Sequence, residues 1–395
     1  MSIKGFTETF DINNYLTIEA LEDGLSASLS TRYCEYCVDG DGNWKSLAKN
    51  TETESINSGH TLSFRGNLTP SGSNGIGTFT ISKKCNLKGN CMSMLFGDNA
   101  ADNYSLNGKN HAFDGLFHDC ANVVNVSSNF LPATTLADSC YYYMFANCSS
   151  LTTAPKLPAS ALASSCYLSM FLGCKNLTTA PELPATTLAS SCYTSMFANC
   201  SSLTTAPELP ATTLADSCYE SMFQNCTSLT TAPELPATTL ANYCYYYMFL
   251  RCSKLNYIKM LATDIFASRC LNNWVYGVAS TGTFVKNPAM NSLPTGKSGI
   301  PEGWTVVDDG EESGDKIVNN IYPIFVEEKG DLSFKMTSEY PVTSLVVLYD
   351  GFDKPIVGIH IGKTQSEKIF LPVDIASTYI SPTEDDTYIY NLVKD

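Results

Sequence analysis

The fold of this chain is decided by a stretch that reads Leu177-Thr-Thr-Ala-Pro-Glu-Leu-Pro-Ala-Thr-Thr-Leu-Ala-Ser-Ser-Cys-Tyr-Thr-Ser-Met-Phe-Ala-Asn-Cys200. Copies of it recur with a period of 26 residues between Leu131 and Leu255. The cysteines mark this period in two registers, which are Cys140, Cys166, Cys192, Cys218, Cys244 and Cys270, and Cys148, Cys174, Cys200, Cys226 and Cys252. Repetition at this length predicts a solenoid, because one unit buries its apolar face only by stacking on its neighbours.

The spacing of apolar residues changes within one unit. The second half carries them at intervals of four in two adjoining rows, Leu188, Cys192, Met196 and Cys200, and Ala189, Tyr193 and Phe197. This spacing predicts an amphipathic helix of about three turns. Asn147, Asn199 and Asn225 stand at the expected left-handed exit of that helix, with Gly173 in the second copy. The first half, such as Leu203 to Pro210, is expected to be extended, because proline biases the preceding residue away from helix.

Two motifs in the repeats connect the chain to a known family. The run Cys200-Ser-Ser-Leu-Thr-Thr, with Pro210 downstream, and the pattern Met196-Phe197-x-x-Cys200 resemble the BspA-like leucine-rich repeat proteins of gut and oral anaerobes, with relatives in phages. The resemblance covers about Phe117 to Trp304, and the unit is longer than the family's usual one of about 23 residues. It implies an α/β leucine-rich-repeat solenoid of strand-helix repeats and a role in binding or adhesion, with no catalytic residues.

Strand signals flank the repeats on both sides. Tyr15-Leu-Thr-Ile-Glu-Ala-Leu alternates before the turn Glu22-Asp-Gly, and Leu345-Val-Val-Leu-Tyr349 and Pro355-Ile-Val-Gly-Ile-His-Ile361 are rich in β-branched residues. We therefore expect N- and C-terminal β-sandwich domains around the solenoid. The predicted organisation is a cap domain at 1–90, the solenoid at 91–307, an acidic linker at 308–315 and a small β-sandwich at 316–395.

Composition excludes several classes of function. The 395 residues carry a net charge of −15, and 18 acidic against 7 basic residues lie in 301–395, so nucleic-acid binding is not expected. No run of 18 apolar residues predicts a membrane span, and the first residues lack a secretory signal. Either the chain was trimmed, or it acts outside the cell without that export route, as a phage structural protein released by lysis does. We expect an extracellular or virion-surface location.

The sixteen cysteines suggest disulfides at first sight, but their spacing does not. Cys192 and Cys200 lie roughly 12 Å apart on the expected helix, beyond the reach of about 7 Å that a disulfide requires. Neighbouring helices would separate equivalent cysteines by about 8–10 Å. We expect reduced, buried thiols that act as small core residues.

Two stretches of the N-terminal region have the look of metal sites. Asp39-Gly-Asp-Gly-Asn43 begins like a calcium loop, but Trp44 replaces the glycine and Asn50 the final glutamate, so a hairpin turn is preferred. Cys34, Cys37, Cys85 and Cys91 offer four thiolates for zinc, yet strand alternation turns the first two to opposite faces. No metal and no cofactor are expected.

Catalytic motifs are also missing from the sequence. No P-loop, G-x-S-x-G or G-x-G-x-x-G string accompanies the four histidines. His118-Asp119-Cys120 raises the possibility of a nucleophile, but adjacent helix residues point in different directions. We predict no enzyme.

Comparison of the copies indicates where a ligand would bind. Core positions hardly change, whereas the positions expected to face outward read Tyr142-Tyr143, Leu168-Ser169, Thr194-Ser195, Glu220-Ser221 and Tyr246-Tyr247. Tyrosines exposed at both ends of an otherwise bland face are typical of contact surfaces, although drift at unconstrained positions is the alternative. A second candidate is the acidic row Glu182, Glu208 and Glu234, which would suit a repeating ligand or serve as a solvated face.

Three functions follow from these patterns. The first is a non-enzymatic recognition protein, a phage virion fibre or receptor-binding component whose ligand is a bacterial surface glycan or protein. The second is a bacterial cell-surface adhesin, and the third a structural spacer or decoration protein without a ligand. The terminal β domains are expected to contact other virion or surface proteins, and neither nucleic acid nor membrane insertion is expected.

Overall fold

The computed structural model describes residues 11–30 and 33–310 and, after them, seven strands. The chain divides into two compact units, Met1–Glu311 and Glu312–Asp395. The described residues of the second unit form two antiparallel sheets with orders β12-β17-β14-β15 and β16-β13-β18. Its strands are β12 (Tyr322–Ile324), β13 (Leu332–Thr337), β14 (Ser344–Asp350), β15 (Pro355–Ile361), β16 (Lys368–Leu371), β17 (Thr378–Pro382) and β18 (Asn391–Lys394).

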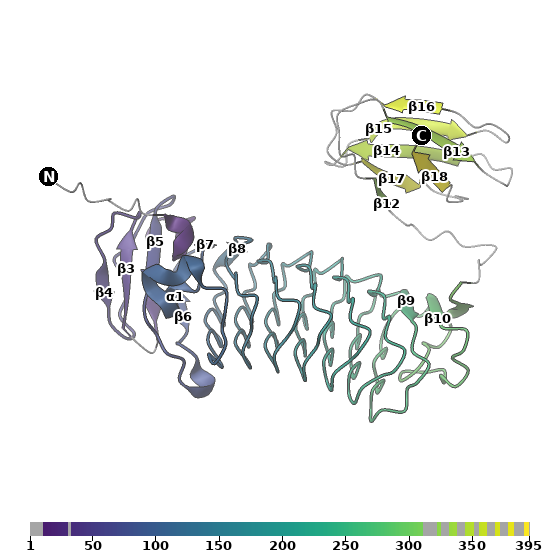
Figure 1. Cartoon of the computed structure of the whole chain (residues 1–395), viewed down its shortest axis with the longest axis horizontal. Helices are drawn as coiled ribbons and strands as arrows, with labels where there is room; N and C mark the ends of the chain where they lie inside the picture. The colour runs from purple at the N-terminus through teal and green to yellow at the C-terminus, as the bar shows by residue number, and fades with distance from the viewer. Residues whose placement is uncertain are drawn as a thin grey trace. The chain divides into compact units, whose positions relative to one another are not determined.

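The first unit begins with an N-terminal β domain, which is purple to blue in Figure 1. Its main sheet has the order β4-β3-β5-β1-β7-β8, and β2 pairs with β6 in a second sheet. The strands are β1 (Leu16–Ala20), β2 (Ala27–Leu29), β3 (Cys34–Val38), β4 (Lys45–Leu47), β5 (Thr61–Arg65), β6 (Phe79–Ile81), β7 (Cys85–Gly89) and β8 (Val123–Val126). Short helical turns complete it, namely η1 (Ile12–Asn14), η2 (Gly72–Asn74), α1 (Ser93–Phe96) and η3 (Gly97–Asp102).

The predicted α/β leucine-rich-repeat solenoid of strand-helix repeats is wrong. Within the described residues, α1 is the only α-helix, and it lies outside the repeats. The segment expected to be helical is a chain of tight turns, because every fourth residue has a positive φ: Ser191 at 56°, Ser195 at 53° and Asn199 at 62°. A residue in the left-handed region breaks an α-helix wherever it occurs. The left-handed conformation expected of Asn147, Asn199, Asn225 and Gly173 is confirmed, although no helix ends there.

Backbone amides in these turns donate alternately within a repeat and between repeats. Met144 N donates to Tyr141 O in its own repeat, whereas Phe145 N donates to Met170 O in the next, at 2.9 Å. The same alternation recurs through the following repeats, for example at Met196 and Phe197. The inward-facing backbone therefore has its hydrogen-bonding groups paired without helix or extended sheet. We call the repeats from Phe113 to Asp308 the repeat stack (Figure 1, blue-green to green).

The proline-containing half of each repeat forms only isolated parallel bridges between neighbours, such as Thr179 with Thr205. Continuous strands occur at the two ends of the repeat stack. At its start β8 pairs with β7, and Asn125 of β8 bridges Thr153 of the next repeat. At its end β9 (Tyr257–Met260), β10 (Thr283–Lys286) and β11 (Thr305–Asp308) form a parallel sheet. The main sheet of the N-terminal β domain therefore continues into the repeat stack.

The core of the repeat stack consists of columns of equivalent side chains. Rings of one column stack with centroids 5.7–5.8 Å apart, and its members are Phe117, Phe145, Phe171, Phe197, Phe223 and Phe249. A second column runs through Phe113, Tyr141, Tyr167, Tyr193, Tyr219 and Tyr245 with spacings of 5.7–6.1 Å. Offset ring stacking of this kind adds to the free energy gained by burial.

All sixteen cysteines are free and buried, as predicted for core thiols. Those of the second register also make a hydrogen bond that their expected role as apolar fillers does not include. The thiol of Cys200 donates to Phe171 O of the preceding repeat at 3.1 Å, and Cys148, Cys174, Cys226 and Cys252 make the equivalent contact at 2.9–3.2 Å. Each of these thiols therefore both fills the core and links two repeats.

Burial of the thiols makes the fold sensitive to alkaline pH. It raises the pKa of Cys192, Cys200 and Cys252 from 9.0 to about 12. A raised thiol pKa favours folding fully below the unfolded pKa near 9, and this contribution is lost as the pH rises toward 12. Each such thiol removes about 1.4 kcal/mol per pH unit in that window. We expect cooperative unfolding near pH 10, followed by near-ultraviolet circular dichroism, and a constant signal between pH 6 and 8.

Alkylation provides the control, because iodoacetamide reacts with the thiolate. At pH 8 the native protein should take up essentially no label over minutes, whereas the guanidinium-unfolded chain should take up sixteen. Rapid labelling of the native thiols, read by intact mass, would contradict the buried-thiol core.

The left-handed turn positions predict substitutions of opposite sign. Ser195 has a φ of 53°, where a side chain costs roughly 1–2 kcal/mol and glycine costs little. We expect Ser195→Gly to raise the free energy of unfolding by about 1 kcal/mol. Ala198 is buried and does not have a positive φ, so Ala198→Gly should lower it by a similar amount. Guanidinium midpoints of both variants test this, and two shifts in the same direction would refute the turn assignment.

Candidate functional site

The positions predicted to face outward form two neighbouring rows on the turns of the repeat stack. Because Tyr141 N donates to Cys166 O and later repeats follow the same register, equivalent residues lie side by side. The first, which we call the turn row, consists of Tyr142, Leu168, Thr194, Glu220 and Tyr246, all of which are half-buried rather than fully exposed. Tyr143 and Tyr247 occupy the neighbouring left-handed position, where Ser169, Ser195 and Ser221 stand in the other repeats. The predicted outward orientation is wrong for Ser169 and Ser221, which are buried.

The tyrosines gather in two clusters along the turn row. Tyr142 and Tyr143 meet edge to face with ring centroids 4.3 Å apart, and burial, followed by the proximity of Tyr143, raises the pKa of Tyr142 to about 12. At the other end, the rings of Tyr246 and Tyr247 lie 3.9 Å apart. Tyr243, which the sequence comparison did not single out, joins this second cluster at 5.6 Å from Tyr246.

Tyr243 could have been found from the sequence. It stands where Ser139, Ser165, Ser191 and Ser217 stand in the other repeats, and Arg269 lies over its ring at 5.8 Å. The second cluster is therefore larger than the first and carries a positive charge.

The acidic row belongs to the other half of the repeat. Glu182, Glu208 and Glu234 are exposed in the proline-containing segments, and no hydrogen bond between described residues joins them to the turn row. Glu234 pairs with Lys259 at 3.3 Å, and Lys259 also pairs with Asp309 at 3.0 Å. The structure therefore keeps the two candidate rows apart and uses one of the three glutamates in an ion pair.

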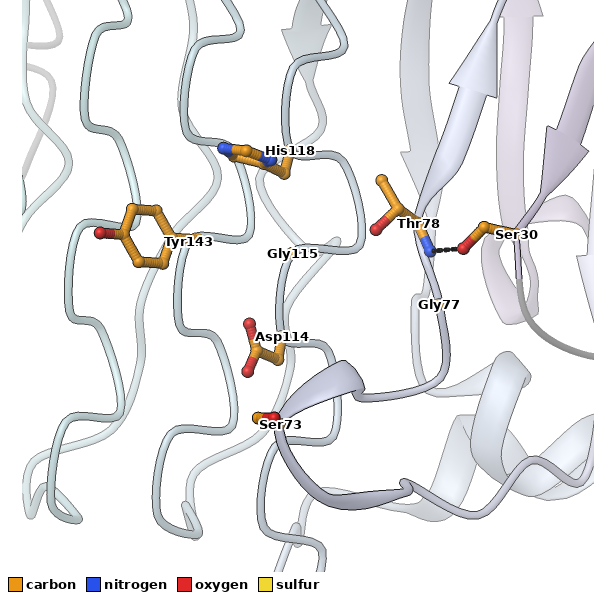
Figure 2. Close-up of a pocket in the computed structure, with 8 residues that line it drawn as sticks. All are labelled: Ser30, Ser73, Gly77, Thr78, Asp114, Gly115, His118 and Tyr143. Carbon is orange, nitrogen blue, oxygen red and sulfur yellow. Dashed lines mark hydrogen bonds between the residues drawn. The ribbon is translucent and has the colours of Figure 1, made fainter.

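A cavity of about 490 Å³ lies where the N-terminal β domain meets the repeat stack. Its lining comes from both sides of the junction: Ser30, Ser73, Gly77 and Thr78 from the β domain, Asp114, Gly115 and His118 from the first repeat, and Tyr143 from the second (Figure 2). The loop that precedes β6 closes directly on the first repeat. At Gly75, with φ of 50°, an added Cβ would lie 2.7 Å from His111 O. Glycine therefore permits the close approach that forms the cavity wall.

Asp114 is the most enclosed ionisable group of the cavity, with a side chain 10% exposed. Burial raises the pKa of its carboxyl, and this effect outweighs the stabilisation of the carboxylate by His111, whose Nδ1 lies 2.9 Å from Oδ2. Oδ1 has no hydrogen bond to the residues that the structure describes. An acceptor oxygen is therefore left for a ligand.

The other polar groups of the cavity have defined partners. His118 Nδ1 lies 3.3 Å from Asp119 Oδ2, and the His118 ring meets the Tyr143 ring edge to face at 5.8 Å. The hydroxyl of Ser30 accepts a hydrogen bond from Thr78 N at 2.9 Å, which holds β6 beside the segment that follows β2. These contacts fix the positions of an imidazole, a phenol ring and the Ser30 hydroxyl around one space.

The structure does not assemble a nucleophile at His118. The thiol of Cys120 is buried and donates to Phe79 O at 3.0 Å. Among the described residues, no serine, threonine or cysteine side chain is hydrogen-bonded to a histidine ring. The absence of enzymatic activity stays a prediction.

The two metal-like stretches have local structural roles. Asp41 Oδ1 accepts from Asn43 N at 2.8 Å within the calcium-like loop, and Asp39 Oδ2 lies 2.6 Å from His60 Nδ1 outside it, so the loop is a tight turn whose carboxylates contact protein groups. Burial raises the pKa of Cys34 to about 12 and that of Cys37 to about 11, which opposes metal binding by these thiols. No group of three or more potential ligands is placed to hold a metal ion in the part of the chain that the structure describes.

Of these cavity residues, sequence reasoning had considered only His118 and Tyr143. Asp114, Thr78, Ser30 and Ser73 were missed, because their proximity depends on how a loop of the N-terminal β domain packs. One feature of the sequence pointed to this place: His118 stands where the next three repeats have Ala146, Leu172 and Ala198, so the first repeat carries a polar ring that these three lack.

No helix among the described residues has the length and apolarity needed to cross a bilayer.

Comparisons with known proteins identify no relative of the chain. No family model matches the chain, no curated protein sequence matches it, and no solved structure matches it. The resemblance to the BspA-like family therefore stays a prediction. The turn row and the cavity are the two features of the molecule on which a function can be proposed.

Proposed function

We propose that this chain is a non-enzymatic recognition protein that binds a bacterial surface glycan or protein along its turn row. One contrast carries the proposal. The buried Tyr, Met, Phe and Cys columns are the same in the five repeats that begin at Tyr141, Tyr167, Tyr193, Tyr219 and Tyr245, whereas the half-buried turn row of these repeats changes from Tyr142 to Leu168, Thr194, Glu220 and Tyr246. A surface that varies over a constant scaffold is how repeat proteins display binding sites.

The tyrosine clusters at the two ends of the row support a contact surface. A tyrosine offers a large ring and one hydroxyl while losing little side-chain entropy, and tyrosines are enriched among residues that dominate binding energy. The clusters are pre-ordered, since Tyr142 packs on Tyr143 and Tyr246 packs on Tyr247. Little ordering is then left for the ligand to impose, which favours affinity.

Among the settings in which such a protein works, we favour display on a phage virion, as a fibre or receptor-binding component. A bacterial surface adhesin is the second candidate, and a spacer without a ligand the third. Genes for capsid and tail proteins beside the coding gene would exclude the adhesin.

Substitution by residues from other repeats gives a direct test. Tyr142→Thr, Tyr143→Ser, Tyr246→Thr and Tyr247→Ser together convert the Tyr142-Tyr143 and Tyr246-Tyr247 pairs into the Thr194-Ser195 pair that the third copy already carries, so the fold should be retained. We expect the variant to bind intact anaerobic bacteria at least tenfold more weakly than the wild type, measured by flow cytometry with labelled protein, because each lost anchor costs about 1 kcal/mol or more.

Tyr104→Ser serves as the matched control, since Tyr104 is 55% exposed and lies outside the row. It should bind like the wild type. Equal binding by the four-tyrosine variant would remove the turn row from recognition, and binding by no form to any strain would support the spacer.

A further inference from the structure

We propose that the cavity between the N-terminal β domain and the first repeat binds one uncharged sugar residue. This inference rests on the proposed function and deepens it, because it assigns the ligand to the glycan class and gives it a specific position. The candidate site consists of Asp114, His118 and Tyr143 on the repeat stack and Thr78, Ser30 and Ser73 on the β domain (Figure 2).

The size and construction of the cavity suit a small ring. Its volume of about 490 Å³ lies within the range of roughly 300–1,000 Å³ that is typical of small-molecule sites. Both walls are held by backbone contacts, since Phe79 N donates to Leu116 O at 2.8 Å and the loop at Gly75 lies against His111. A site formed between two packed elements is more precisely shaped than one on a free loop.

The polar groups match the chemistry of a sugar. Neighbouring hydroxyls of a sugar ring each donate and accept, and Asp114 Oδ1 offers an acceptor while the hydroxyls of Thr78 and Ser73 do both. Hydrogen bonds to a carboxylate are about twice as strong as neutral ones. The rings of Tyr143 and His118, set edge to face, offer an apolar surface for the C–H groups of the sugar.

The charges of the described residues favour an uncharged ligand. Among the described residues that line the cavity there is no lysine or arginine, and Asp114 and Asp119 stand beside it, so these side chains offer no cation to phosphate or to an acidic sugar. A divalent cation lacks ligands, because no described cluster holds three His, Cys, Asp or Glu side chains. An apolar ligand would cover Asp114 Oδ1 without giving it a hydrogen bond.

Asp264 provides a matched control for Asp114. Phe113 N donates to Cys140 O in the register that Tyr141 N follows with Cys166 O, so Asp114 is equivalent to Tyr142 of the next repeat. Asp264 is a half-buried aspartate of the same repeat stack that lies neither on the turn row nor at the cavity, and its Oδ1 accepts a hydrogen bond from Phe266 N at 3.2 Å. A general effect of losing one carboxylate would appear at both residues, whereas a sugar site would depend on Asp114 alone.

The test uses the full-length protein on a glycan array, with titration of free neutral, N-acetylated and acidic monosaccharides followed by ligand-observed NMR. We expect binding of at least one uncharged sugar and of the glycans that contain it, and none of free sialic acid. Asp114→Asn and Thr78→Val, which keep the side-chain shapes, should each weaken binding at least tenfold. Asp264→Asn, which keeps the acceptor for Phe266 N, should leave it within twofold, with thermal melting curves of all variants matching the wild type.

Failure of this inference and failure of the proposed function give different results. If whole cells bind the wild type but not a Tyr246→Thr, Tyr247→Ser variant, whose two positions lie outside the cavity, and no sugar responds to Asp114→Asn or Thr78→Val, the cavity assignment is wrong and recognition by the turn row stands. If a sugar binds with the predicted sensitivity but cells bind the Tyr246→Thr, Tyr247→Ser variant like the wild type, the cavity site stands and the turn row is excluded. Preference for acidic sugars, or equal losses in Asp114→Asn and Asp264→Asn, overturns the inference.

Discussion

The repeat stack depends on one backbone constraint, the alternation of amides between a turn in their own repeat and the next repeat. The alternation requires a left-handed residue at every fourth position, such as Ser191, Ser195 and Asn199, each at some conformational cost. That cost is offset only when Phe197 N donates a hydrogen bond to Met222 O of the neighbouring repeat and the aromatic rings of the two repeats stack. One repeat alone has the strain without the compensation, so stability belongs to the stack rather than to its units.

The period and the buried residues of the repeats could be predicted from the sequence, but the helix expected in the second half of each repeat was wrong. Identical residues at a fixed interval have to align, so the buried cysteines, tyrosines and phenylalanines followed directly from the repetition. The interval of four inside a repeat suggested a helix, yet an α-helix advances about 400° over four residues. Leu188 to Cys200 would therefore drift by roughly 120° around a helix, whereas four-residue turns keep them in line. Ser191 and Ser195 lie eight and four residues before Asn199, and this interval of four indicated the repeated left-handed turn position.

The candidate site was predictable only where it follows from the repetition. Tyr142 and Tyr246 share one row because equivalent residues stack, and that requires no knowledge of the rest of the chain. The cavity requires Thr78 and Ser30 to approach Asp114, which depends on a loop whose Gly75 permits backbone contact with His111. No pairing pattern in the sequence specifies such a contact between an irregular loop and a turn. Because His118 was expected to lie on a helix, its position at the cavity was not predicted.

The architecture separates the chemistry of the proposed binding surface from its dimensions. Repeats bonded through their backbones advance by about 4.8 Å each, so Asp114 and Tyr246, five repeats apart, lie roughly 25 Å from one another along the stack. This distance depends on ring stacking and amide pairing and is independent of the residues on the turn row. Substitutions in the row can therefore change which ligand is contacted without changing the spacing, and gain of a repeat would lengthen the surface by one step. Such a scaffold suits a ligand that is itself extended, since its successive groups meet positions at a fixed interval.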